Sequence, residues 1–389
     1  DISTPNLARL AREGVRLTNC YSNGPVCTPT RTGFVTGRYQ QRVGLEWALV
    51  PADKDAGLPA SETSIARMLK GNGYQTALFG KWHLGIKPEF NPTAHGFDEF
   101  YGILGGNVDM YSHRNSGGTP DLYEKTQPVT REGYLTDHIT ERAITYINEH
   151  KSDAFFMYVP YNAVHWPFQV PGTPNDVRTR ETWFDGTRRD YKLMLERMDQ
   201  GVGQILIALD RENLTRETLI IFTNDNGGER LSKNTPLANR KGTLWEGGIR
   251  VPCLARWSGH LPAGKVSDQA AITMDWTATI LAATNTAPPA GRQLDGINLL
   301  PMLQGRAPQA ERLLFWRITR DERKQKAVRK GKWKLLRDGN IELLFDLERD
   351  PGERHDVGYE NQNMLKELRG LLAGWDAEMN RSNPPYLVK

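Results

Sequence analysis

The chain has 389 residues, a length expected for one large α/β domain with an appendage or for several smaller domains. It carries 50 Lys and Arg against 46 Asp and Glu, a net charge of +4, and this balance gives no argument for a nucleic-acid partner. With 38% apolar and 25% charged residues, the composition excludes long disorder, collagen and coiled coil. No stretch reaches the roughly 18 uncharged apolar residues of a membrane span, and three cysteines cannot form a disulfide framework.

Helical and strand patterns alternate along the first part of the chain. Thr4 and Pro5 mark a helix start, and Gly14 marks its end. The elements expected after this helix are a strand over 15–19, a helix opening near 25–31, a helix over 65–69, a strand over 74–79, a helix over 136–150, a buried strand over 154–159, a helix over 189–209 and a strand over 219–223.

Strands that are apolar on both faces and alternate with helices predict an α/β fold. Its central sheet should be mostly parallel and sandwiched by helices. The pattern changes near Pro301, where strand candidates at 325–336 and 341–347 precede a helix over 363–379. We therefore expect a catalytic domain over residues 1–300 and a small C-terminal antiparallel sheet with a helix over 301–389.

Polar residues follow the predicted strands directly. Lys81 and His83 come after the strand at 74–79, His165 follows the strand at 154–159, and Asp225 follows the strand at 219–223. Ligands of open α/β sheets gather beyond the carboxyl ends of the strands, so these residues should meet at one edge. Taken singly, each has an ordinary interpretation: a loop histidine or, for Asp225 and the Asn226-Gly227 that follow, a turn.

Cys27 stands in the sequence Cys-Thr-Pro-Thr-Arg, followed by Thr36-Gly37. A lone cysteine is usually a buried structural thiol. Here Pro29 near the start of a helix directs backbone N–H groups toward position 27, and Arg31 adds a positive charge one turn later. This arrangement favours an anionic substrate at a nucleophile in position 27.

The chain resembles the type I sulfatases of the alkaline phosphatase superfamily, and the resemblance extends from Thr4 to about Val357. The motifs that carry it occur in the family's order and are Cys27-Thr28-Pro29-Thr30-Arg31, Gly80-Lys81-Trp82-His83-Leu84-Gly85, Asp225-Asn226-Gly227-Gly228 and Lys241-Gly242-Thr243-Leu244-Trp245-Glu246-Gly247-Gly248-Ile249-Arg250-Val251-Pro252. The family implies hydrolysis of aryl or carbohydrate sulfate esters to alcohol and inorganic sulfate. It also implies that a formylglycine-generating enzyme converts Cys27 to Cα-formylglycine, whose hydrate is the nucleophile.

The resemblance assigns roles to the remaining residues. Lys81 and Lys241 would bind the sulfate oxygens, although Lys241 alone could equally be a solvated lysine in a glycine-rich loop. His165 would protonate the leaving alcohol, with Lys241 as a second contributor, and His83 would be the base that releases sulfate. Arg31 would orient the diol.

The resemblance also implies a metal, Ca²⁺ or alternatively Mg²⁺, with Asp225 and Asn226 as two of its ligands. The family completes this site with two aspartates on a strand upstream of the Pro5 helix, and no Asp-Asp pair occurs in the chain. The chain begins at Asp1 without a leader, so we expect that its start is absent or removed and that it binds calcium weakly. The family suggests a periplasmic or secreted protein.

Two other functions stay open at this point. One is a phosphonate or phosphodiester hydrolase of the same superfamily, and the other is a metal-deficient, inactive relative that binds glycans. Between 320 and 337 basic residues outnumber acidic ones. This segment is either a solvated hairpin or a rim that attracts a sulfated polyanion.

Overall fold

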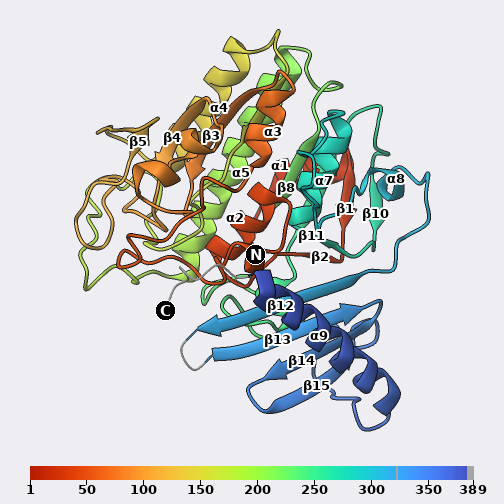
Figure 1. The fold of residues 1–389 in the computed structure, drawn as a ribbon. Helices are drawn as coiled ribbons and strands as arrows, with labels where there is room; N and C mark the ends of the chain where they lie inside the picture. The colour runs from red at the N-terminus through yellow and green to blue at the C-terminus, as the bar shows by residue number, and fades with distance from the viewer. Residues whose placement is uncertain (321–322, 383–389) are drawn as a thin grey trace.

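The computed structural model describes residues 1–320 and 323–382. It has the expected α/β architecture, with helices packed around sheets and a separate antiparallel sheet at the C-terminal end (Figure 1). The helices are α1 (Pro5–Arg12), α2 (Cys27–Thr36), α3 (Ile65–Gly71), α4 (Leu135–Glu149), α5 (Arg188–Arg211), α6 (Glu246–Ile249), α7 (Met274–Ala283), α8 (Leu300–Leu303) and α9 (Gln362–Ser382). Short 3-10 turns lie at Gln40–Arg42, Pro88–Phe90 and Pro92–His95.

The strands before residue 300 form one five-stranded sheet, one four-stranded sheet and one two-stranded sheet. The first sheet has the order β6 (Gln127–Pro128), β5 (Tyr123–Glu124), β4 (Glu99–Ile103), β3 (Gln75–Lys81) and β7 (Phe155–Tyr158). The second has the order β10 (Lys265–Ser267), β1 (Val15–Leu17), β9 (Cys253–Arg256) and β8 (Ile220–Thr223), and β2 (Cys20–Tyr21) pairs with β11 (Ala271–Ile272). Strand β3 runs parallel to both β4 and β7, whereas β9 is antiparallel to both β1 and β8.

The two sheets end on strands β7 and β8, which differ from the sequence prediction in one respect. The strand over 154–159 was expected to be buried, yet every residue of β7, and likewise of β8, is only half-buried. Within the described residues β7 pairs only with β3, and β8 only with β9, so each strand keeps one edge without a ladder. Their side chains nevertheless meet in one apolar cluster, where Met157 and Ile220 pack with Leu209 of α5.

The C-terminal sheet is a meander that packs against α9. Its strands are β12 (Leu313–Arg320), β13 (Arg323–Lys330), β14 (Trp333–Asp338) and β15 (Ile341–Asp346), all antiparallel. Strand β12 was not predicted, whereas the turn at Lys330-Gly331 and the closing helix were, and both are present. The division of the chain at residue 300 stays a prediction, because one hydrophobic core joins Trp316 of this sheet to Tyr21 and Ile249 of the larger part.

A buried ion cluster lies at this junction. Lys334 of β14 is fully buried and its Nζ lies 2.9 Å from Glu246 Oε1 and 2.7 Å from Glu353 Oε1. Tyr21 donates its hydroxyl to the other oxygen of Glu246 at 2.7 Å. Because Glu246 begins α6, the cluster connects the C-terminal sheet to the segment that follows Lys241.

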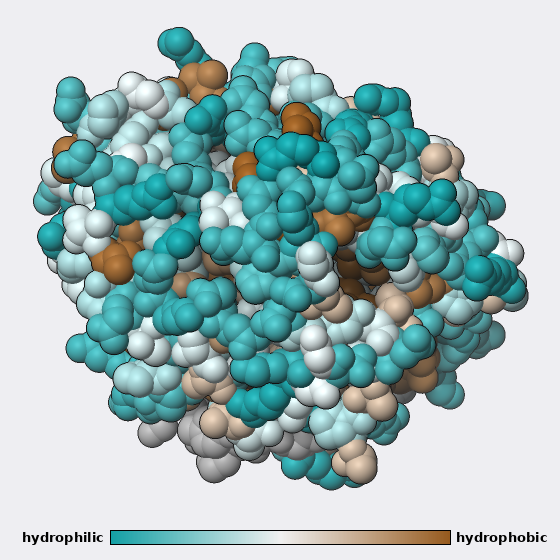
Figure 2. All heavy atoms as spheres, turned by 90° about the horizontal axis from the view of Figure 1, so that it is seen from above, coloured by the Kyte–Doolittle hydropathy of each residue, from teal (hydrophilic) through white to brown (hydrophobic). Residues whose placement is uncertain are grey.

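The basic segment at 320–337 is largely compensated by carboxylates. Lys326 pairs with Asp376, Lys330 with Glu367, Lys332 with Asp346 and Arg337 with Glu342. This pairing favours the solvated hairpin over a rim that attracts polyanions. The surface seen from above is mostly hydrophilic, with hydrophobic side chains in separate spots (Figure 2), and no helix in the described ranges is long and apolar enough to cross a membrane.

Candidate active site

Cys27 is the first residue of α2 and lies at the centre of the expected site. Its side chain is buried, with 3% exposed, and Val26 before it is extended, so the helix begins at the nucleophile itself. The free N–H groups of a helix N-terminus favour an anion in this position. Arg31 follows one turn later and is also buried.

Two lysines from distant segments converge on the Cys27 sulfur. Lys81 ends β3 and places Nζ 3.1 Å from Sγ, and Lys241 Nζ lies 3.8 Å from the same atom. Burial raises the pKa of the Cys27 thiol, but the charges of Lys241 and Lys81 outweigh this effect and hold that pKa well below its usual value. The pair therefore makes the surroundings of position 27 cationic and suited to an anionic group.

His83 lies in the loop after β3, and one of its two ring nitrogens has a hydrogen-bond partner. Its Nε2 contacts the carbonyl oxygen of Leu49 at 2.8 Å, whereas the buried Nδ1 has no hydrogen-bond partner among the described residues. The Thr28 hydroxyl of α2 donates to the carbonyl of His83 at 2.9 Å and fixes the loop against the helix. Burial lowers the pKa of His83, so the ring is neutral and its Nδ1 is available to accept a proton.

His165 and Lys241 form a hydrogen-bonded pair. Lys241 Nζ lies 3.0 Å from His165 Nε2, and His165 Nδ1 lies 3.0 Å from the carbonyl oxygen of Trp166. An ammonium only donates and a carbonyl only accepts, so Nδ1 carries the hydrogen and Nε2 accepts from Lys241. Burial, together with the charges of Lys241 and Lys81, lowers the pKa of His165 to about 4.

Asp225 and Asn226 follow β8 and lie in the same group around Cys27. Both Nε and Nη2 of Arg31 donate to Asp225 Oδ2, at 3.0 and 2.8 Å, and Asn226 Oδ1 lies 3.6 Å from Cys27 Sγ. Arg31 Nη1 donates to the carbonyl of Lys81 at 2.6 Å. Arg31 thus links helix α2, the end of β3 and the loop after β8.

Close backbone packing holds the strand ends in place. A Cβ at Gly80 would lie 2.2 Å from the carbonyl oxygen of Pro160, and one at Gly102 would lie 1.9 Å from that of Gly80. Only glycine fits both positions, since the ends of β3, β4 and β7 approach one another there. This packing brings the loops that carry Lys81 and His165 together.

The segment after Lys241 is held by the C-terminal sheet. The N–H of Leu244 donates to Gln325 Oε1 of β13 at 2.8 Å, and the N–H of Glu246 donates to Glu353 Oε2 at 2.6 Å. Lys241 itself is tied through its N–H to the carbonyl of Gly228 at 3.0 Å. The C-terminal sheet therefore supports the loop that presents a site lysine.

All eight expected residues gather around Cys27, although they come from five separate segments of the chain. Sequence reasoning missed two neighbours of this group. Tyr158, in β7, lies close enough to Arg31, Asp225 and Cys27 to interact with their charges. The Trp166 ring lies tilted against the His165 ring, with ring centroids 4.2 Å apart. Both lie next to predicted positions along the chain, so proximity to a strand end was the available signal.

Comparison with known proteins agrees with this geometry. A family model described as sulfatase matches residues 1–286, and one described as N-sulphoglucosamine sulphohydrolase, C-terminal, matches residues 239–375. The chain is 32% identical to N-acetylgalactosamine-6-sulfatase of Homo sapiens over 95% of its own length and 80% of that protein. It is 31% identical to arylsulfatase A of Bos taurus over 97% of its length and 84% of that protein.

Solved structures give the same result. The crystal structure of Ps i-CgsB in complex with k-i-k-neocarrahexaose superposes with a TM-score of 0.88 at 30% identity, covering 96% of this chain and 87% of that one. The phosphonate monoester hydrolase of Agrobacterium radiobacter has a TM-score of 0.71 at 21% identity, covering 97% and 91%, which shows a shared fold alone. With a sulfatase model matched over most of its length and relatives above 30% identity, the chain belongs to the sulfatase family.

Proposed function

We propose that this sulfatase hydrolyses the sulfate ester of a carbohydrate through a formylglycine at position 27. The observation that carries the proposal is the convergence of two lysine ammonium groups on Cys27 Sγ at the N-terminus of α2. Support for a carbohydrate comes from similar proteins: one is an N-acetylgalactosamine-6-sulfatase, and the Ps i-CgsB structure holds a neocarrahexaose.

The first step places the sulfate group between Lys81 and Lys241. In the mature enzyme the Cys27 sulfur is replaced by the geminal diol of hydrated formylglycine, and one diol oxygen attacks the sulfur of the ester. The bond from sulfur to the ester oxygen breaks, and the departing alkoxide takes a proton from the His165–Lys241 pair. The proton of the attacking hydroxyl replaces it on Lys241, whose Nζ lies 3.8 Å from the sulfur of Cys27. The ammonium of Lys241 holds the proton in this pair, since His165 accepts from it.

The second step releases sulfate. His83 Nδ1, which has no other partner in the described part of the chain, removes the proton of the remaining diol hydroxyl. The aldehyde forms again, the carbon–oxygen bond to the sulfate breaks, and water then rehydrates the aldehyde. A thiol in this position has no second hydroxyl and no comparable exit, which is the physical reason for the modification by a formylglycine-generating enzyme.

The described residues supply only part of the metal site that the resemblance implies. Asp225 and Asn226 supply oxygen donors suited to calcium or magnesium, but Asp225 Oδ2 is already bound by Arg31. Within residues 1–320 and 323–382 no group of three or more His, Cys, Asp or Glu side chains could hold an ion. Calcium usually takes six to eight oxygen ligands, so these two residues form part of a site.

The edges of β7 and β8 suggest where further ligands could enter. Both edges lack a partner in the described residues, and Asp225 follows β8 directly. We expect that a strand bearing two aspartates, paired at these edges, completes the metal site. Elemental analysis should find little calcium in the chain that starts at Asp1 and stoichiometric calcium once such a strand is added. Tightly held calcium in the chain that starts at Asp1 would show that other residues complete the site.

Turnover distinguishes the proposal from its alternatives. A sulfatase should release sulfate from 4-nitrophenyl sulfate much faster than it cleaves a phosphonate monoester of the same phenol. The reverse order would favour the phosphonate hydrolase, which the comparisons support only at the level of the fold. Binding of a sulfated sugar without release of sulfate, in protein that contains formylglycine and metal, would favour the inactive relative.

A further inference from the structure

A row of aromatic rings leads from the site to the surface. The Trp166 ring lies tilted beside the His165 ring, and its centroid lies 5.0 Å from Lys241 Nζ. Phe184 packs edge-on against Trp166 with ring centroids 5.4 Å apart, and 55% of Phe184 is exposed. One end of the row is therefore the proton-donating pair and the other is open to solvent.

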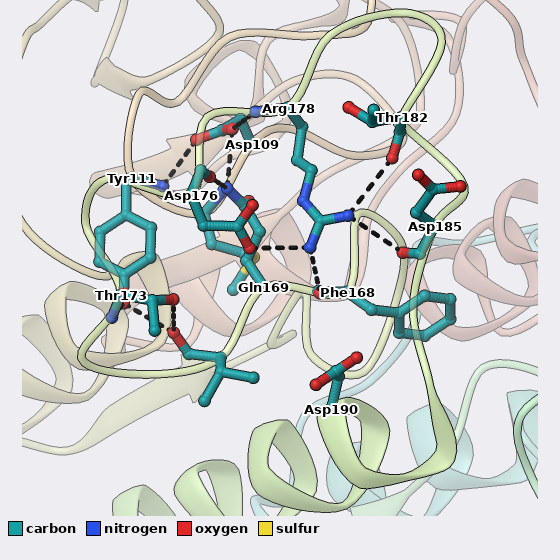
Figure 3. Close-up of polar contacts among 12 residues, drawn as sticks. Asp109, Tyr111, Phe168, Gln169, Thr173, Asp176, Arg178, Thr182, Asp185 and Asp190 are labelled. Carbon is teal, nitrogen blue, oxygen red and sulfur yellow. Dashed lines mark hydrogen bonds and ion pairs between the residues drawn. The ribbon is translucent and has the colours of Figure 1, made fainter.

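Arg178 fixes the loop that carries Phe184. Its guanidinium donates to the carbonyl oxygens of Phe168 at 3.0 Å, Thr182 at 3.4 Å and Asp185 at 3.3 Å (Figure 3). It also pairs with the carboxylate of Asp176 at 2.7 Å. These contacts hold the backbone on both sides of Phe184, so the exposed ring stands on an ordered loop.

A second anchor joins this loop to the segment after β4. The carboxylate of Asp109, which is buried, accepts from Gln169 Nε2 at 2.8 Å and from the N–H of Arg178 at 3.1 Å (Figure 3). Gln169 is also buried, and its Oε1 accepts from the N–H of Met110 at 2.7 Å. Keeping an aromatic ring in water on an ordered loop costs free energy, and this cost is offset when the ring binds a ligand.

We propose that Trp166 and Phe184 form a wall that receives the sugar ring of the sulfate ester, with Arg178 as its positioning residue. This inference rests on the proposed function and names the part of the substrate that lies beyond the sulfate group. A pyranose presents a face of C–H groups that can pack on aromatic rings, while its sulfate lies between Lys81 and Lys241. The His165–Lys241 pair, next to Trp166, then faces the bridging oxygen.

The test compares the binding of D-galactose 6-sulfate with that of inorganic sulfate, measured by titration calorimetry in a Cys27→Ala background that prevents turnover. Phe184→Ala should weaken binding of the sugar sulfate by about 10-fold and change that of sulfate less than about twofold. Phe184→Tyr keeps a ring and should bind like the parent. Tyr359→Ala removes an aromatic side chain that is 89% exposed and lies outside the wall, and should change neither affinity.

Arg178→Met should weaken binding of the sugar sulfate about as much as Phe184→Ala does and leave binding of inorganic sulfate almost unchanged. A general loss of structure would weaken the binding of both ligands. An unchanged affinity of Phe184→Ala for the sugar sulfate, or an equal loss of affinity for both ligands, would overturn this inference and leave the proposed function intact. A parent protein that binds no inorganic sulfate would contradict the proposed function as well.

Discussion

Replacing Lys334 by methionine should destabilise the protein strongly. Lys334 is fully buried and lies within 2.9 Å of two carboxylates, Glu246 and Glu353, that are themselves almost inaccessible. Glu246 keeps the Tyr21 hydroxyl and its ion pair with Arg250 in the variant, whereas Glu353 loses its cation and, among the described residues, keeps only the N–H of Glu246. Removing one partner of a buried ion pair typically costs about 3–5 kcal/mol, and we expect a loss of that size in the free energy of unfolding.

The loss should depend on pH. Burial raises the pKa of Glu353, and the charge of Lys334 works against this rise in the parent protein. Without Lys334 the pKa of Glu353 rises further, so the carboxyl group binds a proton as the pH falls and the repulsion from Glu246 disappears. The difference in stability between variant and parent should therefore shrink on acidification.

Urea unfolding followed by circular dichroism measures these effects. Lys332→Met is the matched control, since Lys332 is partly exposed and its pair with Asp346 should contribute no more than about 1 kcal/mol. The double variant Lys334→Met/Glu353→Gln should recover a large part of the loss because it removes the uncompensated charge. A single variant within about 1 kcal/mol of the parent, or a double variant that recovers nothing, would refute the reasoning.

Three further predictions concern the site and the pH dependence of stability. In enzyme that contains formylglycine and metal, Lys81→Ala and Lys241→Ala should each lower kcat about 10²–10³-fold, because each removes one preorganised charge from the transition state. A near-native kcat would show that the replaced lysine has no role in the chemical step. His165→Ala should slow alkyl sulfates more than aryl sulfates, since a good leaving group needs less protonation, and equal losses would argue against His165 as part of the acid. Burial lowers the pKa of His95 and of His113 to about 4, so the unfolded chain binds more protons between about pH 4 and 6.5, and the free energy of unfolding should rise with pH across this window by up to about 3 kcal/mol per residue. Urea midpoints for the parent and for His95→Gln check this, and a slope that is the same in both would contradict the role of His95.

Much of the site could be predicted because its residues follow strands. The carboxyl ends of neighbouring strands share an edge, so Lys81, His165 and Asp225 could be brought together before any coordinates existed. The sequence could not show which of the site residues form hydrogen bonds with one another. The bond from Lys241 to His165, and the two bonds from Arg31 to Asp225, depend on loop conformations with no periodic pattern.

The fold was predictable to a similar depth. Helices α1, α2 and α4 and the C-terminal hairpin follow from caps, glycines and alternation, and they lie close to the expected ranges. The half-buried state of β7 and β8 was not predictable, because a continuous apolar run indicates burial and says nothing about which neighbour covers each edge. The buried ion cluster around Lys334 was not predicted either, because a basic residue in a strand of alternating apolar and basic residues is expected to face solvent.

The central claim is that a formylglycine at position 27 is the nucleophile. Peptide mass spectrometry of protein made alongside a formylglycine-generating enzyme should find the peptide that contains residue 27 about 18 Da lighter than its cysteine form, and sulfatase activity should rise in proportion to the converted fraction. Full activity in protein whose residue 27 is entirely unmodified cysteine would contradict the account.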